Sequence, residues 1–145
     1  MRSIITVFCS LIFMTGCQQH IDKEKVKEEI LQTEKAFEKM CADQGMQEAF
    51  YFFASDSAVI KRQNDTLIIG KENIKNYYSN PSFKMAKVTW TPDFIDVSDC
   101  GDMAYSYGEY LWKIWSDVGD TAEFIGVFQT VWKKQSDGSW KYVWD

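Results

Sequence analysis

Four side chains in this 145-residue sequence have the types and spacing that acid–base or binding chemistry requires. Tyr105, Tyr107 and Glu109 alternate along one segment, so in a β-strand they share one face. A glutamate among aromatic rings can have a raised pKa and act as an acid or a base. Lys61 could serve as a desolvated base or hold an anionic ligand. The simpler interpretation, that Lys61 and Glu109 face solvent as charged strand residues usually do, stays open.

Other common catalytic and metal sites do not fit the sequence. His20 is the only histidine, and it lies three residues after Cys17, as a solvated tether residue would. A domain with no histidine cannot form a Ser-His-Asp triad, a Cys-His pair or a zinc site with histidine ligands. The acidic turn residues do not follow the spacing of a calcium loop, and no glycine-rich phosphate loop occurs. We therefore expect neither a metal nor a cofactor.

The first seventeen residues follow the pattern of a bacterial lipoprotein leader. Met1 and Arg2 precede an apolar run over residues 4–14, which is too short to span a bilayer as a helix. Residues 14–17, Met-Thr-Gly-Cys, resemble a lipobox, in which the cysteine is lipidated and becomes the new N-terminus. We expect a signal peptide over 1–16 and a tether over 17–21, with a lipid on Cys17 that anchors the exported chain to the cell envelope, facing the periplasm or the surface. An ordinary signal peptide with a chance cysteine is the alternative.

The chain that begins at Cys17 is acidic. It loses only Arg2 from the basic residues, so 15 basic against 21 acidic residues give a net charge of −6. Nucleic-acid binding needs basic patches, and none occurs here, so we expect no nucleic-acid partner. Cys41 and Cys100 remain in the domain. An oxidising compartment would allow a disulfide between them, and two buried free thiols are the alternative.

Periodicity predicts helices first and long strands afterwards. Residues 22–41 have a helical apolar stripe after an Asp22 cap, and residues 46–54 read as a second helix, although a strand could also hold these aromatics. A hairpin over 57–69 and a short helix after Gly70 follow. The remaining strands are expected over 87–98, 103–115, 121–134 and 140–144. This order predicts one α+β domain over 22–145, with helices on one face of a curved antiparallel sheet.

Two segments resemble a known family. Residues 53–74 contain Phe-Ala-Ser-Asp-Ser-Ala-Val-Ile and Ile-Gly-Lys-Glu-Asn-Ile, and residues 90–145 contain Trp-Thr-Pro, Gly-Asp-Met-Ala-Tyr-Ser-Tyr-Gly, Trp-Lys-Lys and Asp-Gly-Ser-Trp-Lys. In order and spacing they are similar to the SnoaL-like, ketosteroid-isomerase-like domains (domain of unknown function 4440) of the nuclear transport factor 2 superfamily. The resemblance implies a cone: a strongly bent sheet wrapped around a long helix, often with a ligand pocket at its mouth.

The resemblance also argues against steroid isomerase chemistry. It puts Lys61 where a ketosteroid isomerase has its aspartate base. The tyrosine that such enzymes carry on the first helix has no counterpart, because no tyrosine occurs over 22–44, and residues 124–132 contain no carboxylate. An isomerase or lyase that uses Lys61, Tyr107 or Glu109 in another arrangement remains an alternative.

All six tryptophans lie between residues 90 and 144, on the expected strands. Aromatic rings on a concave face can line an apolar ligand pocket, or they can simply fill the core, which is the commoner case. The side chains expected to line such a pocket are Lys61, Trp90, Tyr105, Tyr107, Glu109, Trp112 and Phe128. The sequence thus favours noncatalytic binding of a small apolar or amphipathic ligand. Homodimerisation through the outer face of the sheet, common in this superfamily, is the further alternative.

Overall fold

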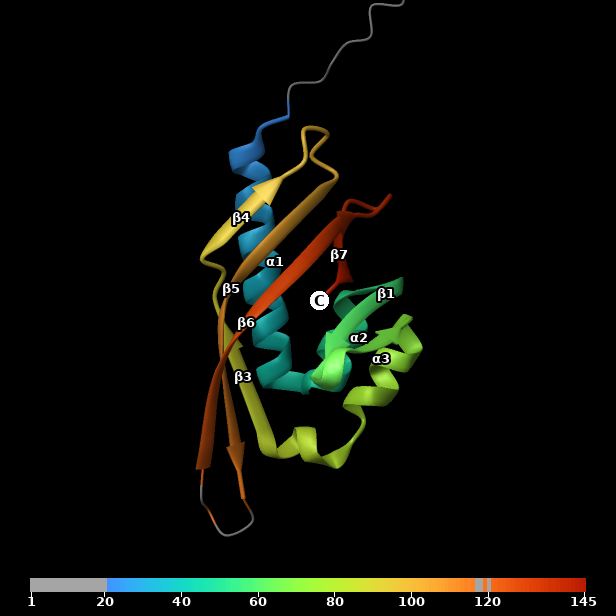
Figure 1. Ribbon diagram of the computed structural model, residues 1–145. Helices are drawn as coiled ribbons and strands as arrows, with labels where there is room; N and C mark the ends of the chain where they lie inside the picture. The colour runs from blue at the N-terminus through green and yellow to red at the C-terminus, as the bar shows by residue number, and fades with distance from the viewer. Residues whose placement is uncertain (1–20, 117–118, 120) are drawn as a thin grey trace, which may run out of the picture.

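The computed structural model describes residues 21–116, 119 and 121–145. Figure 1 shows the elements in chain order. The helices are α1 (Lys23–Gln44), α2 (Met46–Phe53) and α3 (Lys71–Tyr78), with 3₁₀ turns η1 (Gln63–Asp65) and η2 (Pro81–Met85). The strands are β1 (Ala54–Arg62), β2 (Thr66–Ile69), β3 (Ala86–Trp90), β4 (Phe94–Val97), β5 (Met103–Trp115), β6 (Thr121–Lys134) and β7 (Trp140–Trp144).

Local signals explain where the first two helices begin and end. The Asp22 carboxylate accepts a hydrogen bond from the Lys25 backbone N–H at 3.1 Å and so caps α1. Gly45, with a φ of 88°, ends α1 in a conformation that other residues rarely adopt, and α2 starts directly after it. The helical interpretation is confirmed over residues 46–53, whereas Ala54 already belongs to strand β1.

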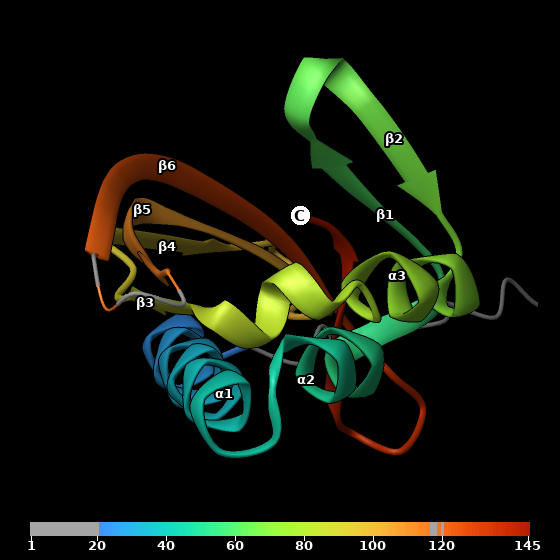
Figure 2. The same cartoon turned by 90° about the horizontal axis from the view of Figure 1, so that it is seen from below.

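The seven strands form one bent sheet in the order β2-β1-β7-β6-β5-β3, and β4 also pairs with β5. Its strands are antiparallel except for the parallel pair β1 and β7. Figure 2 shows the β3–β6 part arching over α1, with α2 and α3 beside it below the β1–β2 hairpin. The α+β class, with N-terminal helices followed by a curved sheet, is confirmed.

The expected single strand over 87–98 is wrong, because the chain breaks into β3 and β4 around Pro92. Proline has no backbone N–H for a sheet ladder. The chain instead crosses closely over β5, where the Asp93 N–H donates to the Tyr107 carbonyl at 2.9 Å. A Cβ on Gly108 would lie 2.7 Å from the Thr91 carbonyl oxygen, so only glycine leaves room for this crossing.

The core forms where α1 meets the concave face of the sheet. Phe37 of α1 lies at its centre, with ring centroids of Phe50, Phe53 and Trp90 at 4.8, 4.9 and 5.1 Å. On β5 the inward positions opposite the helix are small: Ala104, Ser106 and Gly108 are all buried. These small side chains let the helix approach the sheet closely.

We expect Gly108→Ala to lower the free energy of unfolding by about 1–3 kcal/mol, the usual range for overpacking, because its Cβ would meet backbone atoms of residues 91 and 93. Gly126→Ala is the matched variant on β6. The three atoms nearest its Cβ would all belong to the Tyr110 side chain and none to the backbone, so we expect a smaller loss. Urea unfolding curves measure both. Equal losses would show that the crossing at residues 91–93 is not rigid.

Candidate functional site

Glu34 is a buried carboxylate at the centre of the cone. It is 1% exposed on the sheet-facing side of α1. Its Oε1 accepts hydrogen bonds from the Ser106 hydroxyl at 2.5 Å and from the Trp132 indole N–H at 2.9 Å. Its Oε2 accepts one from the Trp90 indole N–H at 2.8 Å. One helix side chain therefore binds three different strands: β3, β5 and β6.

Two opposing effects act on the pKa of Glu34. Burial raises it, because the ionised form loses its hydration inside the cone, and the negative charge of Asp145 acts in the same direction. The hydrogen bonds from Ser106, Trp90 and Trp132 lower it, because indole and hydroxyl donors favour a carboxylate. Burial is the largest effect, so the pKa of Glu34 lies above its usual range.

A second polar cluster joins β1, α3, β6 and the C-terminal segment. The Arg62 guanidinium donates from Nη2 to Asp145 Oδ1 at 2.6 Å and from Nε to the Tyr78 hydroxyl oxygen at 2.8 Å. The Thr130 hydroxyl donates to Asp145 Oδ2 at 3.2 Å. Arg62 also lies over the Phe50 ring, 5.3 Å from its centroid. This ion pair attaches the β1–β2 hairpin to the rest of the sheet.

The two clusters meet on the concave face. Ser106, which binds Glu34, is the direct cross-strand partner of Thr130, which binds Asp145. Both side chains are almost completely buried. We call the five residues Glu34, Ser106, Thr130, Asp145 and Arg62 the buried seam. Its polar atoms bind one another and the side chains of Trp90, Trp132 and Tyr78, which makes the seam a structural element of the cone wall.

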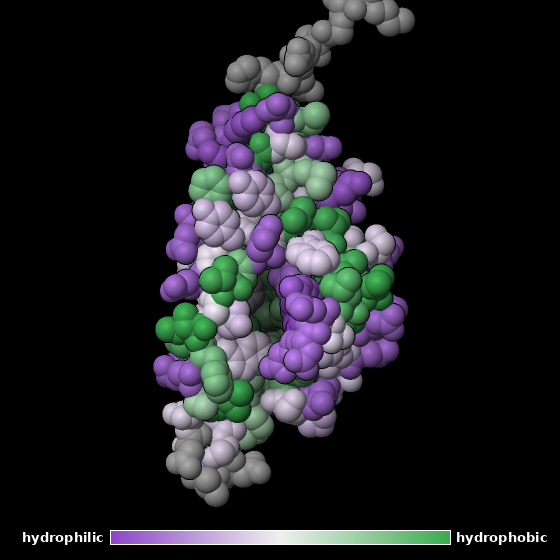
Figure 3. Space-filling view, viewed as in Figure 1, coloured by the Kyte–Doolittle hydropathy of each residue, from purple (hydrophilic) through white to green (hydrophobic). Residues whose placement is uncertain are grey.

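A hollow opens beside this seam. Figure 3 shows it near the middle of the molecule, between the long strands and the β1–β2 hairpin, with apolar surface inside and hydrophilic residues along one rim. Four large rings on the concave face of β3, β5 and β6 stay partly exposed, and we call them the concave aromatics: Trp90, Tyr110, Trp112 and Phe128. The indole N–H of Trp90 is already bonded to Glu34, so the Trp90 ring presents apolar surface to the hollow.

Of the residues expected to line a pocket, Trp90, Trp112 and Phe128 lie on this concave face. Lys61 does not. It is exposed on the opposite side of β1 from the buried Ile60, and it forms an ion pair with Asp65 at 2.6 Å. The inward residue of this segment is Arg62, because side chains alternate along a strand.

The expectation that Tyr105, Tyr107 and Glu109 share one face is correct, but that face is the outer one. All three are exposed and alternate with the buried Ser106 and Gly108. They were expected to point into the cone, and the structure corrects this: small residues must face α1, so the large ones face outward. Phe94 of β4 stacks on Tyr107 there, with ring centroids 5.3 Å apart.

The suggested disulfide does not form. Cys41 and Cys100 are both free thiols, the first buried and the second exposed. Cys41 lies near the C-terminal end of α1, whereas Cys100 lies in the turn beside Lys23, at the other end of the helix. Burial raises the pKa of the Cys41 thiol, which keeps it protonated. Cys17 and His20 lie outside the described residues, so the lipid on Cys17 stays a prediction.

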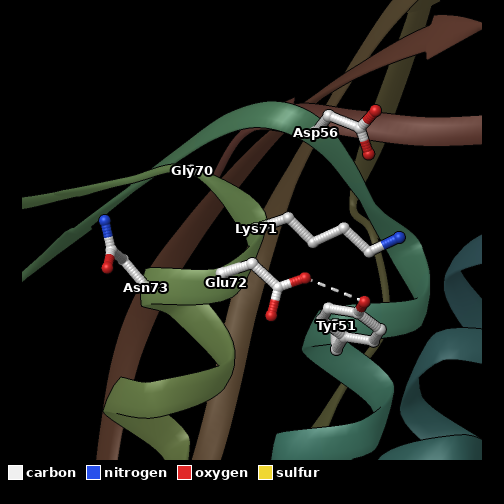
Figure 4. A pocket seen from close by; sticks show the side chains of 6 residues that line it. All are labelled: Tyr51, Asp56, Gly70, Lys71, Glu72 and Asn73. Atoms are coloured by element: carbon white, nitrogen blue, oxygen red, sulfur yellow. Dashed lines mark hydrogen bonds between the residues drawn. The ribbon is translucent and has the colours of Figure 1, made fainter.

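A separate surface groove of about 260 Å³ lies between β1 and α3. Figure 4 shows its six residues and the hydrogen bond from the Tyr51 hydroxyl to Glu72, 2.9 Å long. Lys71 and Lys75 each place an ammonium 4.4 Å from the centre of the Tyr51 ring. The polar and charged side chains of this groove therefore interact with one another: Glu72 with the Tyr51 hydroxyl, and both lysines with the Tyr51 ring.

Neither a metal-binding cluster nor a membrane-spanning helix occurs in the described residues, 21–116, 119 and 121–145. No cluster of three or more His, Cys, Asp or Glu side chains there could hold a metal ion. None of the helices in that part of the chain has the length and apolar character needed to cross a membrane.

No protein-family model and no curated protein matches the sequence. Solved structures do match the fold. An NTF2-like protein with a cystatin-like fold from Novosphingobium aromaticivorans superposes with a TM-score of 0.69 at 15% identity, covering 83% of this chain and 79% of that one. A ketosteroid isomerase-like protein from Erwinia carotovora atroseptica gives 0.64 at 13% identity, over 79% and 89% of the two chains. The chain has an NTF2-like fold.

A third structure with this NTF2-like fold is the association domain of C. elegans CaMKII, with a TM-score of 0.66 at 17% identity over 84% of this chain and 94% of that one. Identities this low establish a common fold and leave the activity open. The cone architecture expected from the sequence is confirmed. Membership of the SnoaL-like branch stays a prediction.

Glu34 and Arg62, two charged residues of the buried seam in this NTF2-like fold, were not among the site residues expected from the sequence. The signals were present. Glu34 lies four residues after Ile30 and three before Phe37, within the apolar stripe of the helix. Arg62 lies two residues after Ile60 and so shares its inward face. A charged residue at a position that continues the apolar face of a helix or strand therefore indicates a buried polar site.

We expect Glu34 to make the free energy of unfolding depend on pH. Because its folded-state pKa lies above the usual value of 4.5, its stabilising contribution is complete below that pH and is lost as the pH rises through the folded-state value. Glu34→Gln removes this dependence. The amide side chain of this variant has one acceptor oxygen for two indole donors, so the variant should be about 1–3 kcal/mol less stable than the parent protein at low pH. The unfolding free energies of variant and parent should converge as the pH rises.

Urea unfolding measured across a pH series tests this, with Glu28→Gln as the control. Glu28 lies on the exposed side of the same helix, so this variant should keep the pH dependence of the parent protein. Parallel curves for the parent protein and Glu34→Gln would contradict the raised pKa.

Proposed function

We propose that this chain is a lipid-anchored cell-envelope protein of the SnoaL-like kind, whose cone holds a small apolar or amphipathic molecule without transforming it. The observation that carries the binding proposal is the set of partly exposed concave aromatics beside the hollow. The lipobox-like residues 14–17 support the anchor. The family resemblance of residues 53–74 and 90–145 supports the branch of the superfamily.

The concave aromatics form a continuous apolar wall. Trp90 is the cross-strand partner of Tyr110, and Val88 is the partner of Trp112. Phe128 lies opposite Gly108 on the neighbouring strand pair, and its ring centroid is 6.4 Å from that of Trp90. Such walls contribute most of the binding free energy in small-molecule sites, with few polar contacts to fix orientation.

The polar groups nearest this wall favour binding over catalysis. Glu34 already accepts three hydrogen bonds and has almost no exposed surface. Arg62 uses its Nε and Nη2 donors on Tyr78 and Asp145. Lys61 and Glu109, the sequence candidates for acid–base work, lie on other faces of the molecule. An acid or base for catalysis would have to be released from these contacts first.

The dye 1-anilinonaphthalene-8-sulfonate, an amphipathic probe, tests the wall. We expect the folded protein to enhance its fluorescence. Trp112→Ala removes a partly exposed ring from the wall and should weaken binding about tenfold, which equals a loss of roughly 1.4 kcal/mol. Trp115→Ala, on the outer-face register of the same strand, is the matched control and should leave affinity unchanged. Native mass spectrometry of the domain from its own host would show a retained ligand. Equal effects of both variants would contradict binding in the cone.

The outer face of the sheet supports a second function, association with a second copy. Its exposed apolar residues, which we call the outer patch, include Ile125 and Val127 of β6, whose exposed fractions are 72% and 74%. Phe94, Tyr105 and Tyr107 complete it. Exposed apolar residues gathered on a sheet face favour burial against a partner, although Glu109 and Gln129 lie among them here. A structure with the same fold, from C. elegans CaMKII, is named an association domain, and this supports the proposal.

Sedimentation velocity of the soluble domain tests association. We expect a dimer for the parent domain and a monomer for Val127→Lys, because an ammonium at the centre of the interface would lose its hydration. Leu67→Lys is the matched control: Leu67 is also exposed, at 51%, but lies on β2 away from the outer patch, so its variant should still dimerise. A parent domain that sediments as a monomer at every concentration would contradict this proposal.

A further inference from the structure

The first described residues are held firmly to one end of the molecule. Ile21 packs so closely on the turn between β4 and β5 that a Cβ on Gly101 would lie 2.6 Å from its side chain. Two residues later the Lys23 ammonium forms an ion pair with Asp99 of the same turn, at 2.6 Å. In Figure 1 this turn and the first turn of α1 lie together at one end, and the far ends of β5 and β6 lie at the other.

The tether between the proposed lipid on Cys17 and this contact is short. Cys17 precedes Ile21 by four residues, which at full extension reach about 14 Å. We infer that the domain stands end-on on the membrane, with residues 21–24 and 98–102 nearest the bilayer and the far ends of β5 and β6 directed into the aqueous space. This inference rests on the proposed lipid at Cys17 and adds to it a direction.

The end nearest the bilayer carries charges of both signs, since the exposed Lys25 and Lys133 lie there beside acidic residues. Asp22, Glu24, Asp99 and Asp102 are all exposed there, and Lys23 and Lys27 are paired with Asp99 and Glu24. Anionic headgroups attract segments in which basic residues predominate, and basic residues do not predominate at this end. The attachment therefore runs through the lipid and the short tether, and the protein surface itself does not adsorb.

The end-on orientation determines which way the hollow and the outer patch face relative to the bilayer. β5 has 13 residues, so it extends about 40 Å away from the membrane end. The hollow lies along the side of the molecule in Figure 3, between its two ends. It therefore opens parallel to the bilayer, and a ligand enters from the aqueous compartment. The outer patch also faces sideways, where a second copy on the same membrane can reach it.

Single fluorescent labels at the two ends test the orientation in the full lipidated chain, reconstituted into vesicles that carry a headgroup-linked quencher. Cys100 is an exposed native thiol at the membrane end, and Cys41 is buried and will not label. We expect a label on Cys100 to lose most of its fluorescence. A label on Thr121→Cys in a Cys100→Ser background marks the far end of β6 and should lose little.

Two further variants separate the anchor from the orientation. Cys17→Ser removes the lipidated cysteine, so this variant should not bind the vesicles. If the parent chain binds the vesicles but both labels are quenched equally, the orientation is overturned while the anchor stands. Insertion of about twenty Gly/Ser residues between residues 20 and 21 should restore fluorescence at Cys100, because a long flexible tether no longer fixes the end. A parent chain that stays off the vesicles, as Cys17→Ser does, would overturn both the anchor and the orientation.

Discussion

The cone depends on one constraint: a carboxylate on the central helix is buried and must be satisfied there. Glu34 meets it by accepting hydrogen bonds from β3, β5 and β6 at once. An unsatisfied carboxylate at this depth would destabilise the fold by several kcal/mol, so the helix cannot slide or rotate against the sheet without losing these partners. Apolar packing around Phe37 supplies most of the stabilisation but would tolerate other registers. The carboxylate selects one of them.

Side-chain alternation along β5 and β6 then gives the two faces of the sheet different roles. Inward positions near α1 must be small or polar enough to fit the helix and Glu34, as Ser106 and Gly108 are. Farther along β5 the helix no longer covers the sheet, so large inward rings such as Trp112 remain partly exposed beside the hollow. The same alternation puts Tyr105 and Tyr107 on the outer face. Pocket and patch are therefore consequences of a single register, and a shift of one residue would exchange them.

Much of this architecture was predictable because it depends on local pattern. The strands over 103–115, 121–134 and 140–144 follow from period-two alternation between turns, and their predicted limits match the structure. Contacts between distant segments were not predictable in the same way. The break at Pro92 depends on Gly108 of another strand, and the parallel pairing of β1 with β7 depends on how the sheet bends. The inward Arg62 was available from alternation with Ile60, whereas the partner it binds, Asp145, lies 83 residues away.

The three surfaces that carry the proposals occupy different parts of the molecule, and the fold explains why they can coexist. A bent sheet has a concave face that the helix only partly covers, a convex face that none of the described residues covers, and an end where the first helix begins. The ion pair between Lys23 and Asp99 ties that helix end to the turn between β4 and β5, and the proposed tether would join the molecule there. A ligand in the hollow touches side chains whose neighbours on the same strands form the patch. Binding and association can therefore influence each other only through the shared backbone of β5 and β6, which the three donors to Glu34 hold in place.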